Sequence, residues 1–235
     1  MGDADVSDAA RPAFYALRPG GWRDYVTLLH PPYTLWHLSY VALGAALAPH
    51  MHWGLLGWTV LAFLLAMGVG AHALDELNGR PLRTQIPGSV LVGLAAVSIA
   101  AACAIGVVVA TRTTLWLLAF VAFGGVVVVA YNLELLGGTV HTDYWFAGAW
   151  GAFPLLTAYF ASAEQIRAEA LAAAAFAFLV SLAQRRLSTV ARGVRRGAAP
   201  PADPELVLRV PETALRLLSA ALPALAAALL LLRAG

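Results

Sequence analysis

Three ionisable side chains lie close together in an otherwise apolar stretch of the sequence. His72, Asp75 and Glu76 are spaced i, i+3 and i+4, so on a helix all three side chains share one face. An ionisable residue at membrane depth is costly, and its position is therefore informative. Helical bundles build metal sites from imidazole and carboxylate groups placed in this way. The spacing predicts metal binding or acid–base chemistry at this point of the chain.

More ionisable residues lie near the ends of other apolar stretches. Glu134, His141 and Asp143 flank one loop, and His37 lies about one turn into the first long apolar stretch. The predicted catalytic residues are Asp75, Glu76 and Glu134. The predicted metal ligands are His37, His72, Asp75, Glu76, Glu134, His141 and Asp143. A hard cation such as Mg²⁺ would select the carboxylates, whereas iron, zinc or manganese could also use the imidazoles.

Each of these residues also has a simpler explanation. A single acid such as Asp75, Glu76 or Asp143 is ordinary at a helix end, where the membrane stops and capping is needed. His37 and His72 have apolar neighbours on both sides, and each could be a buried, hydrogen-bonded histidine. The combination of ligand types from several segments is what favours a site.

A compact basic loop follows Glu76. It reads Asn-Gly-Arg-Pro-Leu-Arg over residues 78–83. The forked donors of arginine suit phosphate or carboxylate recognition. We therefore expect Asn78, Arg80 and Arg83 to contact the substrate. The alternative is that the arginines serve only as positive charge on an inner membrane loop.

The amino-acid composition indicates which class of protein contains these residues. The chain has 235 residues, of which 60% are hydrophobic and only 12% charged, and its mean hydropathy is +0.74. A soluble domain is about 45–50% apolar and about 25% charged, so a soluble enzyme, a disordered chain and a disulfide scaffold are excluded. All fifteen basic residues are arginine, which excludes a Schiff-base lysine and a Walker-type phosphate loop. A net charge of +2 does not indicate a nucleic-acid partner.

Seven apolar stretches are long enough to cross the hydrocarbon core, for which about 20 residues are needed. The sequence predicts an all-α polytopic membrane bundle of about seven transmembrane helices over residues 33–235, preceded by a cytoplasmic or interfacial segment over residues 1–32. The predicted spans are residues 33–50, 53–76, 88–110, 113–133, 143–162, 165–185 and 211–233. A basic, proline-containing loop is expected over residues 186–210.

The arginines also predict the orientation in the membrane. With the N-terminus inside, twelve arginines lie in inner segments and three in outer ones, which are Arg112, Arg167 and Arg233. Cytoplasmic loops carry such an excess. We expect an integral protein of the bacterial inner membrane whose polar residues face the cytoplasm and whose first partner is the lipid bilayer.

Three stretches of this sequence resemble the UbiA superfamily of intramembrane prenyltransferases. Residues 32–35 with 42–48 are similar to the first helix of that family, residues 72–87 to its first aspartate-rich motif, and residues 131–159 to its inner loop and fifth helix. Asp75 is the natural match for one motif aspartate. The segment where the family carries its second motif, residues 181–189, contains no acid.

The resemblance implies a helical bundle around a cytoplasm-facing cavity. It also implies a prenyl diphosphate or related isoprenoid substrate, held through Mg²⁺ and used in prenyl transfer, cyclisation or lyase chemistry. Tyr131 and Asn132, which open the third stretch, are then expected to contact the substrate. The basic run of Arg185, Arg186 and Arg192 could hold a phosphate directly, although arginines cannot replace the metal ligands.

Two alternatives remain at the level of sequence. His37, His72, His141 and Glu134 do not belong to the family pattern, so the same bundle could be recast as a histidine and carboxylate enzyme with a transition metal and a lipid-like substrate. The polar cluster could also be structural, in a membrane protein that binds or transports lipid without catalysis.

Overall fold

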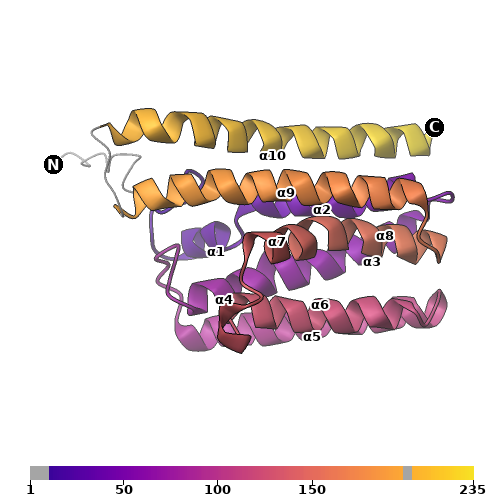
Figure 1. Ribbon diagram of the computed structural model, residues 1–235. Helices are drawn as coiled ribbons and strands as arrows, with labels where there is room; N and C mark the ends of the chain where they lie inside the picture. The colour runs from indigo at the N-terminus through magenta and orange to yellow at the C-terminus, as the bar shows by residue number, and fades with distance from the viewer. Residues whose placement is uncertain (1–10, 198–202) are drawn as a thin grey trace.

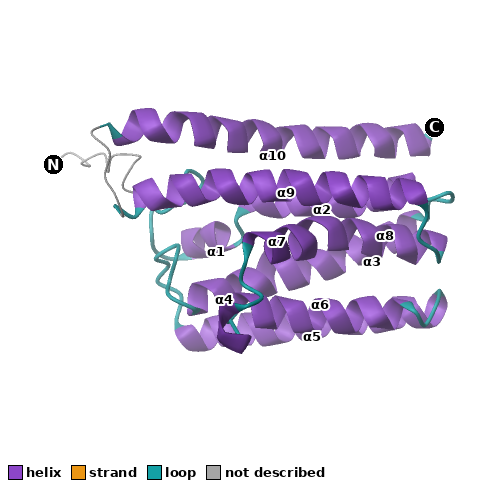
Figure 2. Ribbon diagram, viewed as in Figure 1, coloured by secondary structure: helices purple, strands orange, loops and turns teal. Residues whose placement is uncertain are grey.

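The computed structural model describes residues 11–197 and 203–235, and within these ranges it consists of helices and loops without strands (Figure 2). The first half contains α1 (Trp22–Leu28), α2 (Pro31–Leu47), α3 (Trp53–Phe63), the π-helix η2 (Leu64–Ala71), α4 (His72–Leu77) and α5 (Gly88–Arg112). The second half contains α6 (Leu117–Asn132), the 3₁₀ turn η3 (Leu136–Gly138), α7 (Asp143–Phe146), the π-helix η4 (Ala147–Ala152), α8 (Phe153–Ala163), α9 (Ala168–Arg195) and α10 (Pro204–Ala234).

Helices form at each of the seven predicted apolar stretches. Within the described residues, four helices are long and apolar enough to cross a membrane, which suggests an integral membrane protein; they are Trp53–Leu77, Gly88–Arg112, Ala168–Arg195 and Leu206–Ala234. The apolar α6 and the central α2 are shorter, with 16 and 17 residues. The all-α class is therefore confirmed, and four of the expected crossings meet the length and composition that a span requires.

The predicted loop over residues 186–210 is largely helical. α9 continues to Arg195, and α10 begins at Pro204. The side chain of Asp203 accepts a hydrogen bond from the Leu206 amide at 3.0 Å, and Pro204 follows as the first helical residue. An aspartate cap followed by proline is a strong helix start. Ten more residues of α9 are thus helical than the sequence pattern indicated.

α2 runs through the core of the bundle. Trp36 and Tyr40 are fully buried, and the indole Nε1 of Trp36 donates a hydrogen bond to the Tyr40 hydroxyl at 2.7 Å. Ser181 of α9 donates to the same hydroxyl oxygen at 3.1 Å. α8, α9 and α10 all pack against α2, while α5 and α6 lie on the opposite side of the bundle from α10 (Figure 1).

Two glycines allow the closest helix approaches. A β-carbon on Gly44 of α2 would collide with the main-chain carbonyl of Leu155 in α8. A β-carbon on Gly151 of η4 would meet Ser181 Oγ and the Ala177 carbonyl oxygen of α9. Small residues at such crossings are typical of helix packing in membranes. These two contacts set the positions of α8 and η4 against α2 and α9.

The segment before α2 folds back onto the loop that follows α4. The carboxylate of Asp24 in α1 accepts hydrogen bonds from the amides of Gly20, at 2.9 Å, and Gln85, at 2.8 Å. Asp24 is buried. The described part of the predicted segment 1–32, from residue 11 onward, is therefore ordered against the bundle. Residues 1–10 lie outside the described part of the chain.

Both ends of α10 are fastened to the rest of the bundle. Near its start, the buried Glu212 forms a two-pronged ion pair with Arg195 of α9, at 2.6 and 2.9 Å. At its far end, Arg233 donates hydrogen bonds to the carbonyl oxygens of Ala46 and Ala48, at 2.7 and 2.8 Å. These carbonyls end α2 and lack helical partners. A cation at a helix C-terminus also meets the negative end of its dipole.

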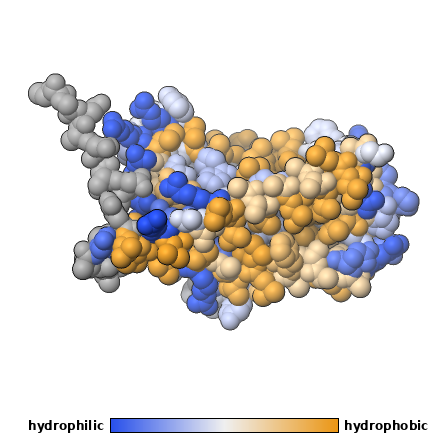
Figure 3. Space-filling view, turned by 90° about the horizontal axis from the view of Figure 1, so that it is seen from above, coloured by the Kyte–Doolittle hydropathy of each residue, from blue (hydrophilic) through white to orange (hydrophobic). Residues whose placement is uncertain are grey.

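The surface above α10 is mostly apolar along the length of the bundle and hydrophilic towards both ends (Figure 3). Exposed large apolar residues occur on several helices, among them Val97, Val126, Leu179 and Leu231. An apolar belt between two polar ends is the surface expected of a protein that lies in a bilayer.

Candidate functional site

A cavity of about 570 Å³ lies at the end of the bundle where α4 ends and α2 begins. Its walls come from the segment before α1, α2, α4, the following loop, α6, α9 and the start of α10. The cavity is polar, and it is where the sequence-predicted site residues gather. Of these, Glu76 and Asp143 are the two that do not line it.

Two π-helical segments border this cavity. η2 leads directly into His72 and Asp75, and η4 carries Trp150. π-helical turns are rare and occur often at functional sites. Here both turns lie directly beside side chains that line the cavity.

His30 and His72 form a stacked pair on one wall. Their ring centroids are 4.0 Å apart and the ring planes are inclined by 9°. Nδ1 of His72 is 3.1 Å from the Gly68 carbonyl oxygen, so this nitrogen carries the hydrogen. The Tyr15 hydroxyl lies 3.0 Å from Nδ1 of His30. Burial and the neighbouring His72 hold the pKa of His30 well below its ordinary value, and burial raises the pKa of Tyr15.

Asp75 and Glu76 are neighbours with different surroundings. Glu76 is fully buried and accepts hydrogen bonds from the Leu82 amide, at 2.9 Å, and from the amide and hydroxyl of Thr84, at 2.8 and 2.9 Å. Its carboxylate therefore holds the loop and does not line the cavity, and the catalytic and metal-binding role expected for it stays a prediction. Asp75 lines the cavity and accepts no hydrogen bond from the described residues.

The basic loop after α4 is shaped by its own arginine. Arg80 has a positive φ of 53°, and its Nη1 donates to the carbonyl oxygens of Thr84 and Ile86 at 3.3 and 2.6 Å. Arg83 also has a positive φ and is exposed at the cavity rim. The Arg80 side chain thus stabilises the conformation of the loop through these hydrogen bonds. Both Arg80 and Arg83 also line the cavity.

The end of α6 supplies Tyr131 and Asn132. Asn132 is buried, donates to the Val128 carbonyl oxygen at 2.6 Å, and offers its own carbonyl oxygen to the Asn78 side chain at 3.2 Å. These bonds tie α6 to the loop after α4. Glu134 follows in a left-handed conformation and is exposed at the rim. The buried Tyr131 hydroxyl, by contrast, has no hydrogen-bond partner among the described residues.

His141 and Asp143 interact with α9 instead of with the other predicted ligands. Nδ1 of His141 donates to the Tyr131 carbonyl oxygen at 2.9 Å, and its Nε2 lies 3.3 Å from Nη2 of Arg185. Asp143 pairs with Nε of Arg185 at 3.2 Å and with Nε of Arg186 at 3.1 Å. The Asp143 carboxylate is therefore neutralised by two guanidinium groups.

α9 contributes a stripe of polar residues, of which the sequence analysis singled out only Arg185 and Arg192 as possible phosphate ligands. Gln184, Arg185, Ser188, Arg192 and Arg195 all line the cavity. They are spaced at one, four, eight and eleven residues from Gln184, which places them on one helical face. This spacing can be read from the sequence. However, Ser188, Arg192 and Arg195 fall within residues 186–210, which were predicted to form a loop.

Four buried polar atoms on the cavity walls have no hydrogen-bond partner among the described residues. They are His30 Nε2, His37 Nδ1, Tyr131 Oη and Gln184 Oε1. Buried polar groups normally find partners, and an unpaired one calls for an explanation. All four belong to residues that line this one cavity, so a polar ligand or bound water there would satisfy them.

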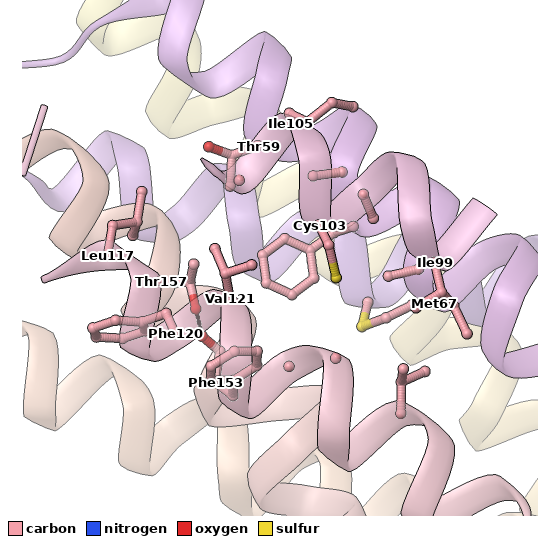
Figure 4. A pocket seen from close by; sticks show the side chains of 18 of the residues that line it. Thr59, Met67, Ile99, Cys103, Ile105, Leu117, Phe120, Val121, Phe153 and Thr157 are labelled. Atoms are coloured by element: carbon pink, nitrogen blue, oxygen red, sulfur yellow. Dashed lines mark hydrogen bonds between the residues drawn. The ribbon is translucent and has the colours of Figure 1, made fainter. Parts of the chain in front are cut away.

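An apolar pocket of about 100 Å³ shares one lining residue, Trp150, with the polar cavity. Figure 4 shows its side chains, which come from α3, η2, α5, α6 and α8 and include Met67, Cys103, Val121 and Phe153. Trp150 lines both spaces. Its ring is stacked with Phe146, with centroids 5.8 Å apart, and lies 4.5 Å from the Tyr131 ring. Three aromatic rings thus line the polar cavity, and one of them, Trp150, also lines the apolar pocket.

The residues present do not fit a multi-ligand metal centre. Among the described residues, no group of three or more His, Cys, Asp or Glu side chains is arranged to hold a metal ion. Glu76 is occupied by the loop and Asp143 by two arginines. The Mg²⁺ that the family resemblance implies would find one inner carboxylate, Asp75, and the donor set is equally incomplete for iron, zinc or manganese.

No protein-family model, curated protein or solved structure matches this chain. The function must therefore be argued from the cavity and the pocket themselves.

Proposed function

We propose that this protein is a UbiA-like integral-membrane enzyme that acts on a prenyl diphosphate or a related phosphorylated isoprenoid. The observation that carries the proposal is the polar, arginine-lined cavity, which shares the lining residue Trp150 with an apolar pocket. An amphiphile with a charged headgroup and a hydrocarbon tail matches this pair of spaces. Clefts with apolar walls and a few placed polar groups are typical ligand sites.

The positions of the arginines indicate how the protein would be oriented in the membrane. The cavity opens where α9 ends and α10 begins, whereas Arg112, Arg167 and Arg233 lie at the opposite ends of their helices. The excess of arginine on the cavity side favours a cytoplasmic location for it. The substrate headgroup would then enter from the cytoplasm of a bacterial cell, with its tail within the inner membrane.

The aromatic rings of the cavity have a chemical role in this proposal. Departure of a diphosphate from a prenyl chain leaves an allylic cation, and the faces of aromatic rings attract cations. Tyr131, Phe146 and Trp150 border the place where the headgroup and the tail would join. The guanidinium groups of the cavity would stabilise the charge that develops on the departing diphosphate. Transfer, cyclisation and elimination all begin with this step.

The proposal is tested by measuring the affinity of the purified protein in nanodiscs for farnesyl diphosphate, farnesol and inorganic diphosphate. We expect farnesyl diphosphate to bind at least about tenfold more tightly than either fragment, because it occupies both spaces. Val121→Trp, which fills the apolar pocket, should weaken binding of farnesyl diphosphate but not of inorganic diphosphate. Val126→Trp is the matched control, since Val126 lies on the same helix and is exposed.

Equal affinity for farnesyl diphosphate and inorganic diphosphate would contradict the proposal that one ligand occupies both the cavity and the pocket. Recovery of the bound farnesyl diphosphate unchanged after prolonged incubation, with and without candidate acceptors, would instead indicate a lipid-binding protein without catalysis. Release of diphosphate, measured with a coupled phosphate assay, is the result expected of an enzyme.

A further inference from the structure

The carboxylates around the cavity are mostly engaged. Glu76 binds the loop after α4, Asp143 is held by two arginines, and Glu212 is paired with Arg195. Glu134 lies exposed at the rim. Asp75 is thus the single inner carboxylate of the described residues that faces the cavity without such a partner. One carboxylate is a weak basis for binding a diphosphate through divalent metal ions, which bridge several carboxylates and the phosphates.

The cavity has a surplus of positive charge. The arginines that line it are Arg80, Arg83, Arg185, Arg192, Arg195 and Arg196, and the carboxylates that line it are Asp75, Glu134 and Glu212. Six positive groups therefore face three negative ones. Because arginine stays charged in proteins, this surplus persists at all physiological pH values and favours an anionic ligand.

Arg192 has no carboxylate partner among the described residues. It is half-buried, and its two terminal nitrogens donate only to hydroxyl oxygens of its own helix, on Ser188 at 3.2 Å and on Thr189 at 3.3 Å. Arg185 and Arg195, by contrast, each have a carboxylate. Arg192 and Asp75 line the same cavity.

Neutral donors and acceptors lie deeper in the same cavity. The Tyr131 hydroxyl and the Gln184 amide oxygen are buried and unpaired. Gln184 and Arg192 are eight residues apart on the cavity face of α9. The Tyr131 hydroxyl can donate to an oxygen of an anionic headgroup, and Gln184 can accept from water around it. These unpaired atoms are a second indication, independent of charge, that a polar ligand belongs here.

We propose that this cavity binds the phosphate groups of its ligand directly through Arg192 and Arg185, without a divalent metal ion. The inference rests on the proposed function and deepens it, since it specifies how the headgroup is held. Arginine forks match two phosphate oxygens at once, and Arg192 can exchange its two hydroxyl partners for such oxygens.

Calorimetric titration of inorganic diphosphate into the full-length protein in nanodiscs tests this mode of binding. We expect binding in excess EDTA to match binding with Mg²⁺ within about twofold. Arg192→Gln should weaken binding about tenfold or more, because it removes charged hydrogen bonds. Arg192→Lys should lie between, since lysine keeps the charge without the fork. Arg209→Gln is the control, since it removes the same charge from an exposed position on α10.

The outcomes separate the two proposals. Binding that requires Mg²⁺ and survives Arg192→Gln would overturn metal-independent binding while leaving an isoprenoid diphosphate as the substrate. No binding of diphosphate with or without Mg²⁺ would overturn both. A melting temperature recorded for each variant shows that it is folded, and Arg192 holds no other helix in place in the described structure.

Discussion

The imidazole rings of His30 and His72 stack almost in parallel, with centroids 4.0 Å apart. His30 precedes α2 and His72 begins α4, so the stack joins two elements of the cavity wall. A protonated ring here would be buried and would face another imidazole. The pair therefore depends on both rings being neutral.

This stack predicts a loss of stability in acid. Burial holds the pKa of His30 well below its ordinary value, which is about 6.5 in an unfolded chain. Below about pH 6.5 the unfolded state consequently binds more protons than the folded state, and the free energy of unfolding falls as pH falls. Melting temperatures at about pH 7.5 and about pH 5 should show a smaller drop for His30→Gln than for the native protein.

His50→Gln serves as the control for this measurement. His50 is exposed at the other end of the bundle, and its replacement should leave the native pH dependence in place. A drop between the two pH values that is the same in His30→Gln as in the native protein would show that other groups cause it.

Asp75 and Glu76 should respond differently to loss of charge. Glu76→Gln removes one of the two oxygens that accept the Leu82 and Thr84 hydrogen bonds, and an unpaired buried amide costs about 2 kcal/mol. We expect a lower melting temperature and faster proteolysis within residues 78–87. Asp75→Asn, which breaks no hydrogen bond of the described structure, should keep its melting temperature and change diphosphate binding. The reverse pattern would support the predicted role of Glu76 in the site.

The ion pair between Arg195 and Glu212 should be the strongest polar link between α9 and α10. Both side chains are almost fully buried, with exposed fractions of 2% and 9%. Glu212→Ala removes the carboxylate that neutralises the buried Arg195 guanidinium and should destabilise the protein by about 3 kcal/mol. The double replacement Arg195→Met with Glu212→Leu should recover part of this loss, because no buried charge remains. Chemical denaturation of the three variants in detergent measures both effects.

Gly44 should tolerate no side chain. Its β-carbon position overlaps the Leu155 carbonyl oxygen, so Gly44→Ala must push α8 away from α2, at a cost of about 1–3 kcal/mol. Gly57→Ala on α3 is the matched control, since nothing lies within 4 Å of its β-carbon position. Thermal melting of the two variants tests this prediction. Equal melting temperatures would mean that the α2–α8 contact relaxes freely.

The helices were predictable from apolar stretches, and their ends less so. Hydropathy located α5 and α10 because a membrane-spanning helix is apolar over its whole length. It ended the sixth stretch at Arg185, where the arginines begin, although α9 continues to Arg195. Charged residues continue a helix as readily as apolar ones do, so a change in polarity marks the edge of the membrane and not the end of the helix.

The sequence predicted where the site residues gather better than it predicted the role of each residue. His72, Asp75 and Tyr131 do line one cavity, because their stretches end at the same end of the bundle. Glu76 differs because its partners are amides of a loop that folds back onto it. Neither that loop conformation nor the pairing of Asp143 with Arg185 leaves a mark in local spacing. Roles that depend on such tertiary contacts require the structure.

The apolar pocket carries its own reporter. Cys103 is the single cysteine of the chain, and its sulfur lies on the pocket wall beside Gly125. Any label that reacts with thiols alone would therefore mark the protein at this one position, with no engineered background. Protection of that thiol by an isoprenoid chain would read out occupancy of the pocket directly, in intact membranes as well as in detergent.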